Sequence, residues 1–146
     1  MDNNKYKNSK VQGFRSKLEQ YCWEHLNSEN ISFSYEPFQI VLVDGFIYQP
    51  ESYEKIGKGK ESFKSQRNKI QPIKYTPDFV SNSVVEKVTW VIETKGYFNP
   101  LSRLKWKLFK RWLEQEGYTW HLFLPTNRQE VKQSIDLIKY NKNDNE

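Results

Sequence analysis

Apolar residues recur at helical spacing near the start of the chain. Over residues 14–27, Leu18, Cys22 and Leu26 form one stripe, and Glu19 lies at the edge of that stripe rather than opposite it. The spacing predicts an amphipathic helix whose buried face is bordered by an acidic side chain. A glutamate at such an edge is commonly an ordinary boundary residue, so the pattern alone gives Glu19 no function.

Short runs with the alternation or apolar content of β-strands make up much of the remaining chain. They comprise residues 31–35, 38–43, 75–79, 90–95 and 118–125. Asp44-Gly45 is a strong turn signal after the second run. The segment over residues 49–71 is polar and lysine-rich and contains Gly57 and Gly59, so we predict a solvated basic loop there.

Two further helices are predicted, one on each side of the last strand. Asn99 and Pro100 are typical of a helix start and Gly117 of a helix end, which predicts a helix over residues 100–116. The apolar residues of this helix that are expected to pack on the sheet are Leu101, Leu104, Leu108 and Trp112.

The last helix is expected to begin at a capping box. The box is formed either by Thr126 with Gln129 or by Asn127 with Glu130. The apolar side of this helix comprises Val131, Ile135 and Ile138. The order of elements predicts an α/β fold in which helices flank a mixed β-sheet. We expect one domain over residues 13–140, with a disordered basic arm over 1–12 and a disordered tail over 141–146.

Two of the predicted strands carry charged residues where strands this hydrophobic would ordinarily carry apolar ones. Glu93 and Lys95 share one face of their strand. Pro77 keeps the residue before it extended and fixes the direction of Asp78. A carboxylate and an ammonium group are costly to bury unless something uses them, so these positions are candidates for chemistry.

Asp78 and Glu93 have the separation of a β-hairpin, with residues 81–83 as turn material. Antiparallel pairing would bring both carboxylates and Lys95 into one cleft. Such hard oxygen ligands bind Mg²⁺ and leave coordination sites for water and a substrate phosphate. The pattern predicts a metal site for cutting phosphodiesters, although an Asp–Glu–Lys set on neighbouring strands is also typical of a solvated sheet face or a surface salt bridge.

The composition favours one domain that binds a polyanion. The chain has 146 residues, of which 36% are hydrophobic and 28% charged, and its net charge is +5. This balance favours nucleic acid as a partner, and an acidic membrane surface second. The single cysteine, Cys22, excludes an internal disulfide framework and a cysteine zinc site, so we expect a cytoplasmic location. Residues 1–10 lack the apolar core of a signal peptide, and no apolar run has membrane-spanning length.

Basic residues gather in the segment 49–71 and on one face of the helix predicted over residues 100–116. A charged run is often only a solvated surface, but in a nuclease both sets would hold the DNA backbone. Lys105 differs, because helical spacing places it within the apolar face, from which it would extend to solvent or to the cleft. The residues predicted to contact DNA are Arg15, Lys17, Lys58, Lys60, Lys64, Arg67, Arg103, Lys105, Lys107, Lys110 and Arg111.

Three blocks of sequence occur in an order that has a counterpart in a known family. They are residues 14–19 (FRSKLE), 75–79 (YTPDF) and 92–96 (IETKG). The blocks resemble the active-site blocks of phage endonuclease I, a family of Holliday-junction resolvases with the PD-(D/E)xK restriction-endonuclease-like fold. The segment between Asp44 and Lys74 looks longer than the family's equivalent, and the part of the chain from residue 100 onward matches less clearly.

The resemblance implies an endonuclease that depends on Mg²⁺, with Mn²⁺ as a substitute, and that cuts branched DNA in recombination. Glu19, Asp78, Glu93 and Lys95 fall on the family's catalytic positions. Asp78, Glu93 and the Thr94 carbonyl would be metal ligands, and Glu19 would hold a second metal or its water. Lys95 would orient the attacking water and neutralise the phosphate. The family also implies products with a 5′-phosphate and a 3′-hydroxyl.

The resemblance further implies an intertwined homodimer, in which residues 38–43 and the segment that follows bridge the two subunits. Other functions stay open at this point. The same blocks resemble, more loosely, transposon-end-cutting TnsA-type nucleases, which nick strands. A nuclease fold that only docks DNA in a recombination or transposition complex is the alternative from another class, although four intact residues of catalytic type argue against it. A nuclease directed at RNA also fits the sequence.

Overall fold

The computed structural model describes residues 13–144. The predicted basic arm, residues 1–12, lies outside the described residues, as do residues 145–146. The chain divides into two compact units, of which the second is Ile40–Tyr75 and the first comprises the residues on either side of it. The second unit contains more of the chain than the insertion that the sequence predicts over residues 49–71.

The first unit is built on a four-stranded mixed sheet with the strand order β1-β6-β7-β8. Its strands are β1 (Ser34–Tyr35), β6 (Phe79–Val80), β7 (Trp90–Ile92) and β8 (His121–Phe123). Strands β7 and β8 are parallel, and the other neighbours are antiparallel. The predicted hairpin is confirmed, because Phe79 of β6 pairs with Ile92 of β7. Its connection is longer than a simple turn and contains the 3-10 helix η1 (Val85–Lys87).

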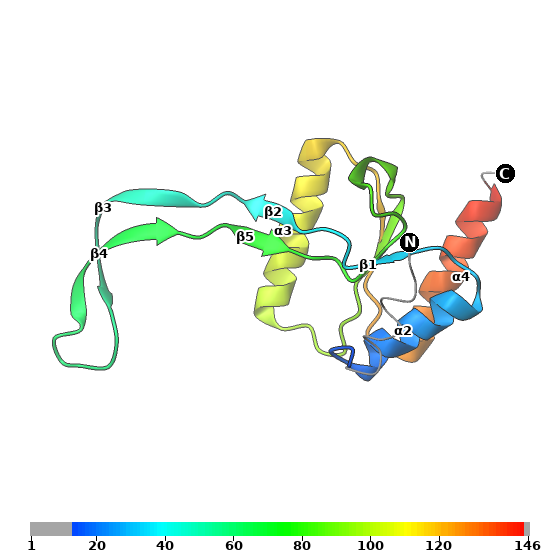
Figure 1. Ribbon diagram of the computed structural model, residues 1–146, viewed down its shortest axis with the longest axis horizontal. Helices are drawn as coiled ribbons and strands as arrows, with labels where there is room; N and C mark the ends of the chain where they lie inside the picture. The colour runs from blue at the N-terminus through cyan, green and yellow to red at the C-terminus, as the bar shows by residue number, and fades with distance from the viewer. Residues whose placement is uncertain (1–12, 145–146) are drawn as a thin grey trace. The chain divides into compact units, whose positions relative to one another are not determined.

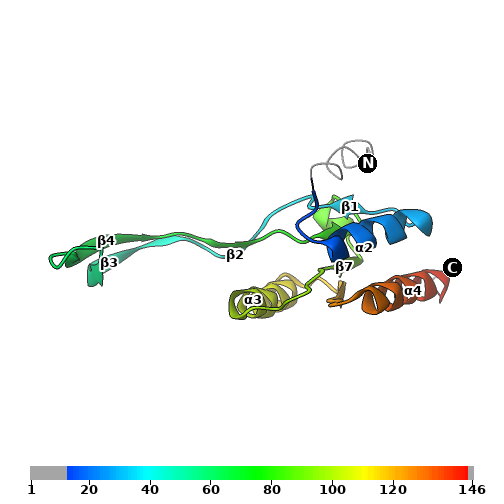
Figure 2. The same cartoon turned by 90° about the horizontal axis from the view of Figure 1, so that it is seen from below.

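Helices cover both faces of this sheet. Helices α2 (Lys17–Ser28) and α4 (Arg128–Asp144) lie side by side on one face, and α3 (Pro100–Glu116) lies on the other (Figures 1 and 2). The layers follow from the alternation of side chains along β7. Trp90 and Ile92 join the core formed with α2 and α4, whereas Val91 between them points to the other face. The predicted α/β arrangement of helices around a mixed sheet is thus confirmed.

The limits of α3 agree with the sequence prediction, but its buried face does not. Asn99 caps the helix by accepting a hydrogen bond from the Ser102 N–H, and Gly117 ends it with a φ of 79°. The buried residues are Trp106, Phe109 and Leu113. Leu101 and Leu104, which were expected to pack on the sheet, are 62% and 50% exposed. The aromatic stripe is buried instead because its rings remove more apolar surface from water than the leucines do.

The start of α4 decides between the two predicted capping pairs. Asn127 accepts a hydrogen bond from the Glu130 N–H at 2.9 Å, and Glu130 accepts from the Thr126 N–H at 2.8 Å. The predicted apolar side, Val131, Ile135 and Ile138, is buried. The prediction of a disordered tail from residue 141 is wrong for residues 141–144, which continue α4. Neither glycine nor proline interrupts the helix there, and the residue types present are compatible with a helical backbone.

The second unit consists of two antiparallel strand pairs. Strand β2 (Ile40–Val43) pairs with β5 (Ile73–Tyr75), and β3 (Phe46–Lys55) pairs with β4 (Phe63–Ile70). The prediction of a loop over residues 49–71 is therefore wrong for most of these residues, and its alternative, a dimer-bridge insertion, stays a prediction. Paired strands satisfy each other's backbone N–H and C=O groups, so polar, exposed side chains do not prevent strand formation.

Asp44-Gly45, the turn signal in the sequence, forms the link between β2 and β3, and these two strands do not pair with each other. The two strand pairs follow one another along a single ribbon (Figure 1). A Cβ atom on Gly45 would lie 2.8 Å from the Ile70 carbonyl oxygen on the opposite side of the ribbon. Glycine is required there because the two backbones approach closely. In a sequence, a glycine needed for a turn cannot be distinguished from a glycine needed for such a close approach.

Candidate active site

Asp78 lies immediately before β6 and is held in place by the neighbouring strand. Its Oδ2 atom accepts hydrogen bonds from the N–H and the Oγ1 hydroxyl of Thr94, each at 3.1 Å. Its own N–H donates to Oε2 of Glu93 at 3.2 Å. All three side chains are buried. The hairpin therefore fixes Asp78 through Thr94, which donates to its carboxylate, and through Glu93, whose carboxylate accepts from the Asp78 backbone N–H.

The chain remains extended beyond the end of β7, as far as Lys95. The N–H groups of Glu93 and Lys95 donate to the carbonyls of Phe123 and Pro125, at 2.9 and 3.1 Å. The Thr94 N–H points the other way, to Asp78. Glu93 and Lys95 consequently share one side of the strand, as predicted, and Lys95 Nζ lies 3.7 Å from Glu93 Oε1. The lysine side chain is partly exposed, so its ammonium group borders solvent beside a buried carboxylate.

Glu19 enters the site from the first turn of α2. Ser16 begins this helix by accepting a hydrogen bond from the Glu19 N–H at 3.1 Å. The Glu19 side chain is only 3% exposed, and its Oε1 atom accepts a hydrogen bond from the Tyr35 hydroxyl. The residue that the helical pattern places at a boundary is thus buried, and its carboxylate joins that of Asp78.

Glu36 completes an acidic cluster and was not found from the sequence. One carboxylate oxygen from each of Glu19, Glu36 and Asp78 lies within 4.8 Å of the others, a spacing that can hold a metal ion. The Glu36 N–H donates to the Asp78 carbonyl at 2.8 Å, and its φ of 45° is unusual for a residue other than glycine. Such backbone conformations concentrate at functional sites. No periodicity or motif in the sequence points to Glu36.

The predicted metal ligands and the acidic cluster overlap in part. Glu19 and Asp78 belong to both sets. Glu93 adjoins the cluster through its bond to the Asp78 N–H but is not one of the three residues whose oxygen atoms converge. Thr94 donates to Asp78, and the role of its carbonyl as a ligand stays a prediction. Carboxylate oxygens at this spacing are the donors that a hard divalent cation prefers.

Arg15, which the sequence predicts as a DNA contact, contacts the acidic cluster in this structure. Its Nη2 atom donates to Oδ1 of Asp78 at 3.1 Å and also to Oε1 of Glu36. Its Nε atom lies 3.8 Å from Oε2 of Glu19. The Arg15 side chain is 67% exposed, so a guanidinium group borders the solvent side of all three carboxylates.

Burial raises the pKa of both central carboxyl groups. For Asp78, this effect outweighs the hydrogen bonds from Thr94 and the attraction of Arg15, and the pKa is raised. For Glu19, burial together with the Asp78 charge outweighs the hydrogen bond from Tyr35, and the pKa is again raised. The two carboxyl groups therefore bind protons more tightly than exposed carboxyl groups do. A bound divalent cation would also neutralise the buried negative charge and so offset its cost in free energy.

We expect metal binding at this cluster to strengthen as pH rises from about 4, the ordinary range of carboxyl groups. The raised pKa values of Glu19 and Asp78 mean that protons stabilise the metal-free fold at low pH, and that this stabilisation is lost as pH rises through the raised values. At a pH above the raised pKa values, added Mn²⁺ should restore the lost stability by binding the ionised carboxylates. The check is the Mn²⁺-induced rise in Tm across a pH series, and a rise that did not grow with pH would contradict the assignment.

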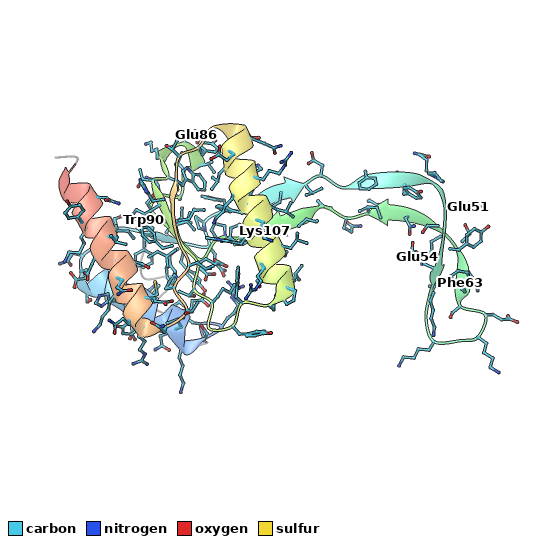
Figure 3. The ribbon with its side chains drawn as sticks, turned by 180° about the vertical axis from the view of Figure 1, so that it is seen from behind. Glu51, Glu54, Phe63, Glu86, Trp90 and Lys107 are labelled. Carbon is cyan, nitrogen blue, oxygen red and sulfur yellow. The ribbon has the colours of Figure 1, made fainter. Side chains whose placement is uncertain are left out.

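The predicted DNA contacts lie mainly on exposed surfaces of the two units. On α3, Arg103, Lys107 (Figure 3), Lys110 and Arg111 are exposed, and Lys105 is half-buried. Lys58, Lys60 and Lys64 are exposed on the ribbon, and Lys17 is exposed on α2. The Arg67 side chain lies outside the part of the chain that the structure describes. Among the helices that are described, none has the length and apolar character needed to cross a membrane.

The geometry distinguishes the site from a solvated sheet face. A surface salt bridge would leave its carboxylates in water, but the Glu19, Asp78 and Glu93 side chains are buried and interconnected.

Comparison of the chain with protein-family models, with curated proteins and with solved structures finds no match.

Proposed function

We propose that the chain is a divalent-metal-dependent endodeoxyribonuclease that hydrolyses phosphodiesters in branched DNA. In this proposal it is a junction resolvase of the phage endonuclease I type, with the PD-(D/E)xK fold. The observation that carries the proposal is the connection of Glu19, Asp78, Glu93 and Lys95 within one buried acidic site. Buried carboxylates are retained at a cost in free energy, and a cation that binds substrate phosphate gives them a use.

The acidic cluster provides the oxygen donors for Mg²⁺ or Mn²⁺, with Glu93 and the Thr94 carbonyl completing the proposed ligand set. Such a cation, when bound, lowers the pKa of a nearby water and offsets the charge that develops on the phosphate. Thr94 fixes the orientation of the Asp78 carboxylate through its two hydrogen bonds. Glu93 in turn holds the Lys95 ammonium group at the solvent border. There Lys95 would orient the attacking water and offset phosphate charge.

Lys95→Ala should separate the chemistry from metal binding. We expect the cleavage rate to fall by about 10²- to 10⁴-fold, the usual contribution of a positioned acid–base or charged group. Mn²⁺ binding should not weaken, because the Lys95 ammonium group supplies no oxygen atom to a cation and its ion pair is with Glu93. Single-turnover cleavage and Mn²⁺ titration provide the two readouts. Lys87→Ala, an exposed lysine on η1, is the control, and a large loss of Mn²⁺ binding in Lys95→Ala would show a structural role instead.

DNA as the substrate is supported by the charge of the chain and by its distribution. The net charge is +5, and exposed lysines and arginines lie on α2, on α3 and on the ribbon. Side chains that only follow the backbone contribute affinity through phosphate contacts and counterion release, without reading bases. The proposed preference for branched DNA therefore requires two active sites at a fixed separation, as in a homodimer.

Neutralising Lys58, Lys60 and Lys64 together should weaken binding to DNA of every shape. Each phosphate contact contributes about 0.9 to the slope of log affinity against log salt, so the slope should also flatten. Binding isotherms at several salt concentrations, for a junction and a duplex, provide the measurement. The double variant Lys87→Ala/Lys132→Ala removes exposed lysines from η1 and α4 and serves as control. Loss of junction preference at constant duplex affinity would assign the ribbon to shape selection, and no change would make it a solvated surface.

A homodimer is supported by the apolar residues of the ribbon. A two-stranded ribbon is marginally stable alone and ordinarily needs a further surface against its apolar side chains. The large hydrophobic residues of β3 and β4 that are at least 40% exposed are Phe46, Ile47, Tyr48, Tyr53, Phe63 (Figure 3) and Ile70. We infer that a second copy of the chain covers them.

The proposed function is tested by offering the purified chain several nucleic acids, with Mg²⁺ and with a chelator. The set comprises a four-way junction, a matched duplex, single-stranded DNA and duplex RNA. We expect paired cuts in the junction that leave 5′-phosphate and 3′-hydroxyl ends, and no cuts when the metal is chelated. Tight binding without cleavage would indicate a docking module. Nicking of duplex alone, or preferred cleavage of RNA, would replace junction resolution by the corresponding nuclease activity.

A further inference from the structure

The two buried carboxylates of the acidic cluster share one pattern of hydrogen bonding. In Asp78, Oδ2 accepts both bonds from Thr94, and Oδ1 accepts from Arg15. In Glu19, Oε1 accepts from Tyr35, and Oε2 faces Arg15 Nε at 3.8 Å. In each group one oxygen is held by the fold and the other is directed to the same guanidinium. The oxygen atoms that remain for an added ligand therefore converge on Arg15.

Arg15 balances part of the charge that the cluster would otherwise leave uncompensated. Glu19 and Asp78 are each 3% exposed, and carboxylates this buried are unfavourable without a nearby cation. A guanidinium presents several N–H donors in one plane and can contact three acceptors at once, as Arg15 does with Asp78, Glu36 and Glu19. The contact thus keeps the three carboxylates together in the absence of a metal ion.

Arg15 is also attached where it can leave the cluster without disturbing the core. It precedes Ser16, the N-cap of α2, so its backbone is outside the helix. Its side chain is 67% exposed, so solvent is already in contact with most of it. A change in the Arg15 side chain therefore requires no repacking of the buried residues of α2.

We propose that Arg15 is a resident cation that a divalent metal ion replaces when it binds the cluster. The proposal rests on the proposed function, because the metal ion is that of the nuclease site. A Mg²⁺ ion binds carboxylate oxygens at about 2.0–2.1 Å, and Arg15 Nη2 lies 3.1 Å from Asp78 Oδ1. Two cations on the same oxygen atom would repel one another strongly in a partly buried site. The Arg15 guanidinium then moves to solvent, with which most of its side chain is already in contact.

The test compares Mn²⁺ binding by the wild-type chain and by Arg15→Ala at pH 8, without DNA. Removal of the competing guanidinium should tighten Mn²⁺ binding about tenfold, the effect of an opposing charge that shifts a carboxyl pKa by about one unit. Arg15→Ala should also unfold at a lower temperature in chelator, and Mn²⁺ should raise its Tm by more than it raises that of the wild type. Lys132→Ala, which removes an exposed positive charge on α4, should change neither quantity.

The outcomes separate this inference from the proposed function. Arg15→Lys keeps a positive charge but loses the planar set of donors, so its Mn²⁺ affinity should fall between those of the wild type and Arg15→Ala. It also provides the measurement if Arg15→Ala does not fold. Equal or weaker Mn²⁺ binding in both variants would overturn the exchange and make Arg15 a supporting residue. Absence of Mn²⁺ binding by all three chains, with and without DNA, would count against the metal site itself.

Discussion

Substitution of Asp78 by asparagine should abolish DNA cleavage while leaving DNA binding intact. The amide has almost the same volume, and with its oxygen toward Thr94 it keeps the two hydrogen bonds that orient the side chain. It then presents an NH₂ group to Glu19, Glu36 and Arg15, in place of the carboxylate oxygen that accepts from Arg15. A hard cation cannot bind to that group. We expect the cleavage rate to fall on the order of 10⁴-fold, as when an essential catalytic group is removed.

Cleavage of a labelled four-way junction under single-turnover conditions provides the measurement, together with gel-shift binding in Ca²⁺. Asp136→Asn, an exposed position on α4, removes one negative charge away from the cluster and should cleave at the wild-type rate. The circular dichroism spectrum and Tm of Asp78→Asn show whether the fold is retained. Cleavage at the wild-type rate by a folded Asp78→Asn chain would remove Asp78, and with it the Pro-Asp motif, from the mechanism.

The sequence predicts best those elements whose signals are local. The start and end of α3 follow from Asn99, Pro100 and Gly117, because caps depend on the conformation of single residues. The hairpin that joins Asp78 to Glu93 follows from the short separation of two strand-like runs. The motif then identifies Asp78, Glu93 and Lys95, since their types and spacing are set by the strands themselves.

Helical periodicity does not decide which of two apolar faces is buried. On α3, a leucine stripe and an aromatic stripe both fit a helix, and the sheet face that covers one of them is formed by distant residues. The sequence fails to predict the ribbon strands for a similar reason. Residues 49–71 of the ribbon are mostly polar and depend on pairing rather than on a buried apolar pattern, and a polar segment with two glycines is read as a loop.

The parts of the site that the sequence does not predict depend on tertiary contacts. Glu36 lies between a short strand and Pro37, and two contacts hold it at the cluster: the bond from its N–H to the Asp78 carbonyl and the ion pair of its carboxylate with Arg15. Arg15 belongs to a block that resembles a nuclease family, yet its contact with three carboxylates follows from the start of α2 and the placement of β6. The positive charge of Arg15 predicts a contact with DNA phosphate. In the folded chain, however, the nearest anions to its guanidinium are the three carboxylates of the cluster.

Replacement of Phe46 and Phe63 by glutamate should convert the chain from a dimer to a monomer. Phe46 lies opposite Ile70, and Phe63 lies 6.3 Å from Tyr53 between ring centroids, so each is part of an exposed apolar pair on the ribbon. Burying a large apolar side chain contributes about 1.5–3 kcal/mol. A two-fold dimer contains each side chain twice, so four are lost, and the dimer Kd should rise by at least about 10⁴-fold, since each 1.4 kcal/mol is a factor of ten.

Sedimentation velocity at micromolar concentration distinguishes the two states. Gln66→Glu adds a negative charge to the same ribbon without removing an apolar side chain, so it should remain dimeric. The double glutamate variant should retain the acidic cluster and nick one strand at a time, because the cluster is made wholly from residues outside the ribbon. It should lose the paired incision of a junction, which requires two sites related by two-fold symmetry. A wild-type chain that sediments as a monomer and still cuts both strands of a junction together would contradict the dimer and require a single site to act twice.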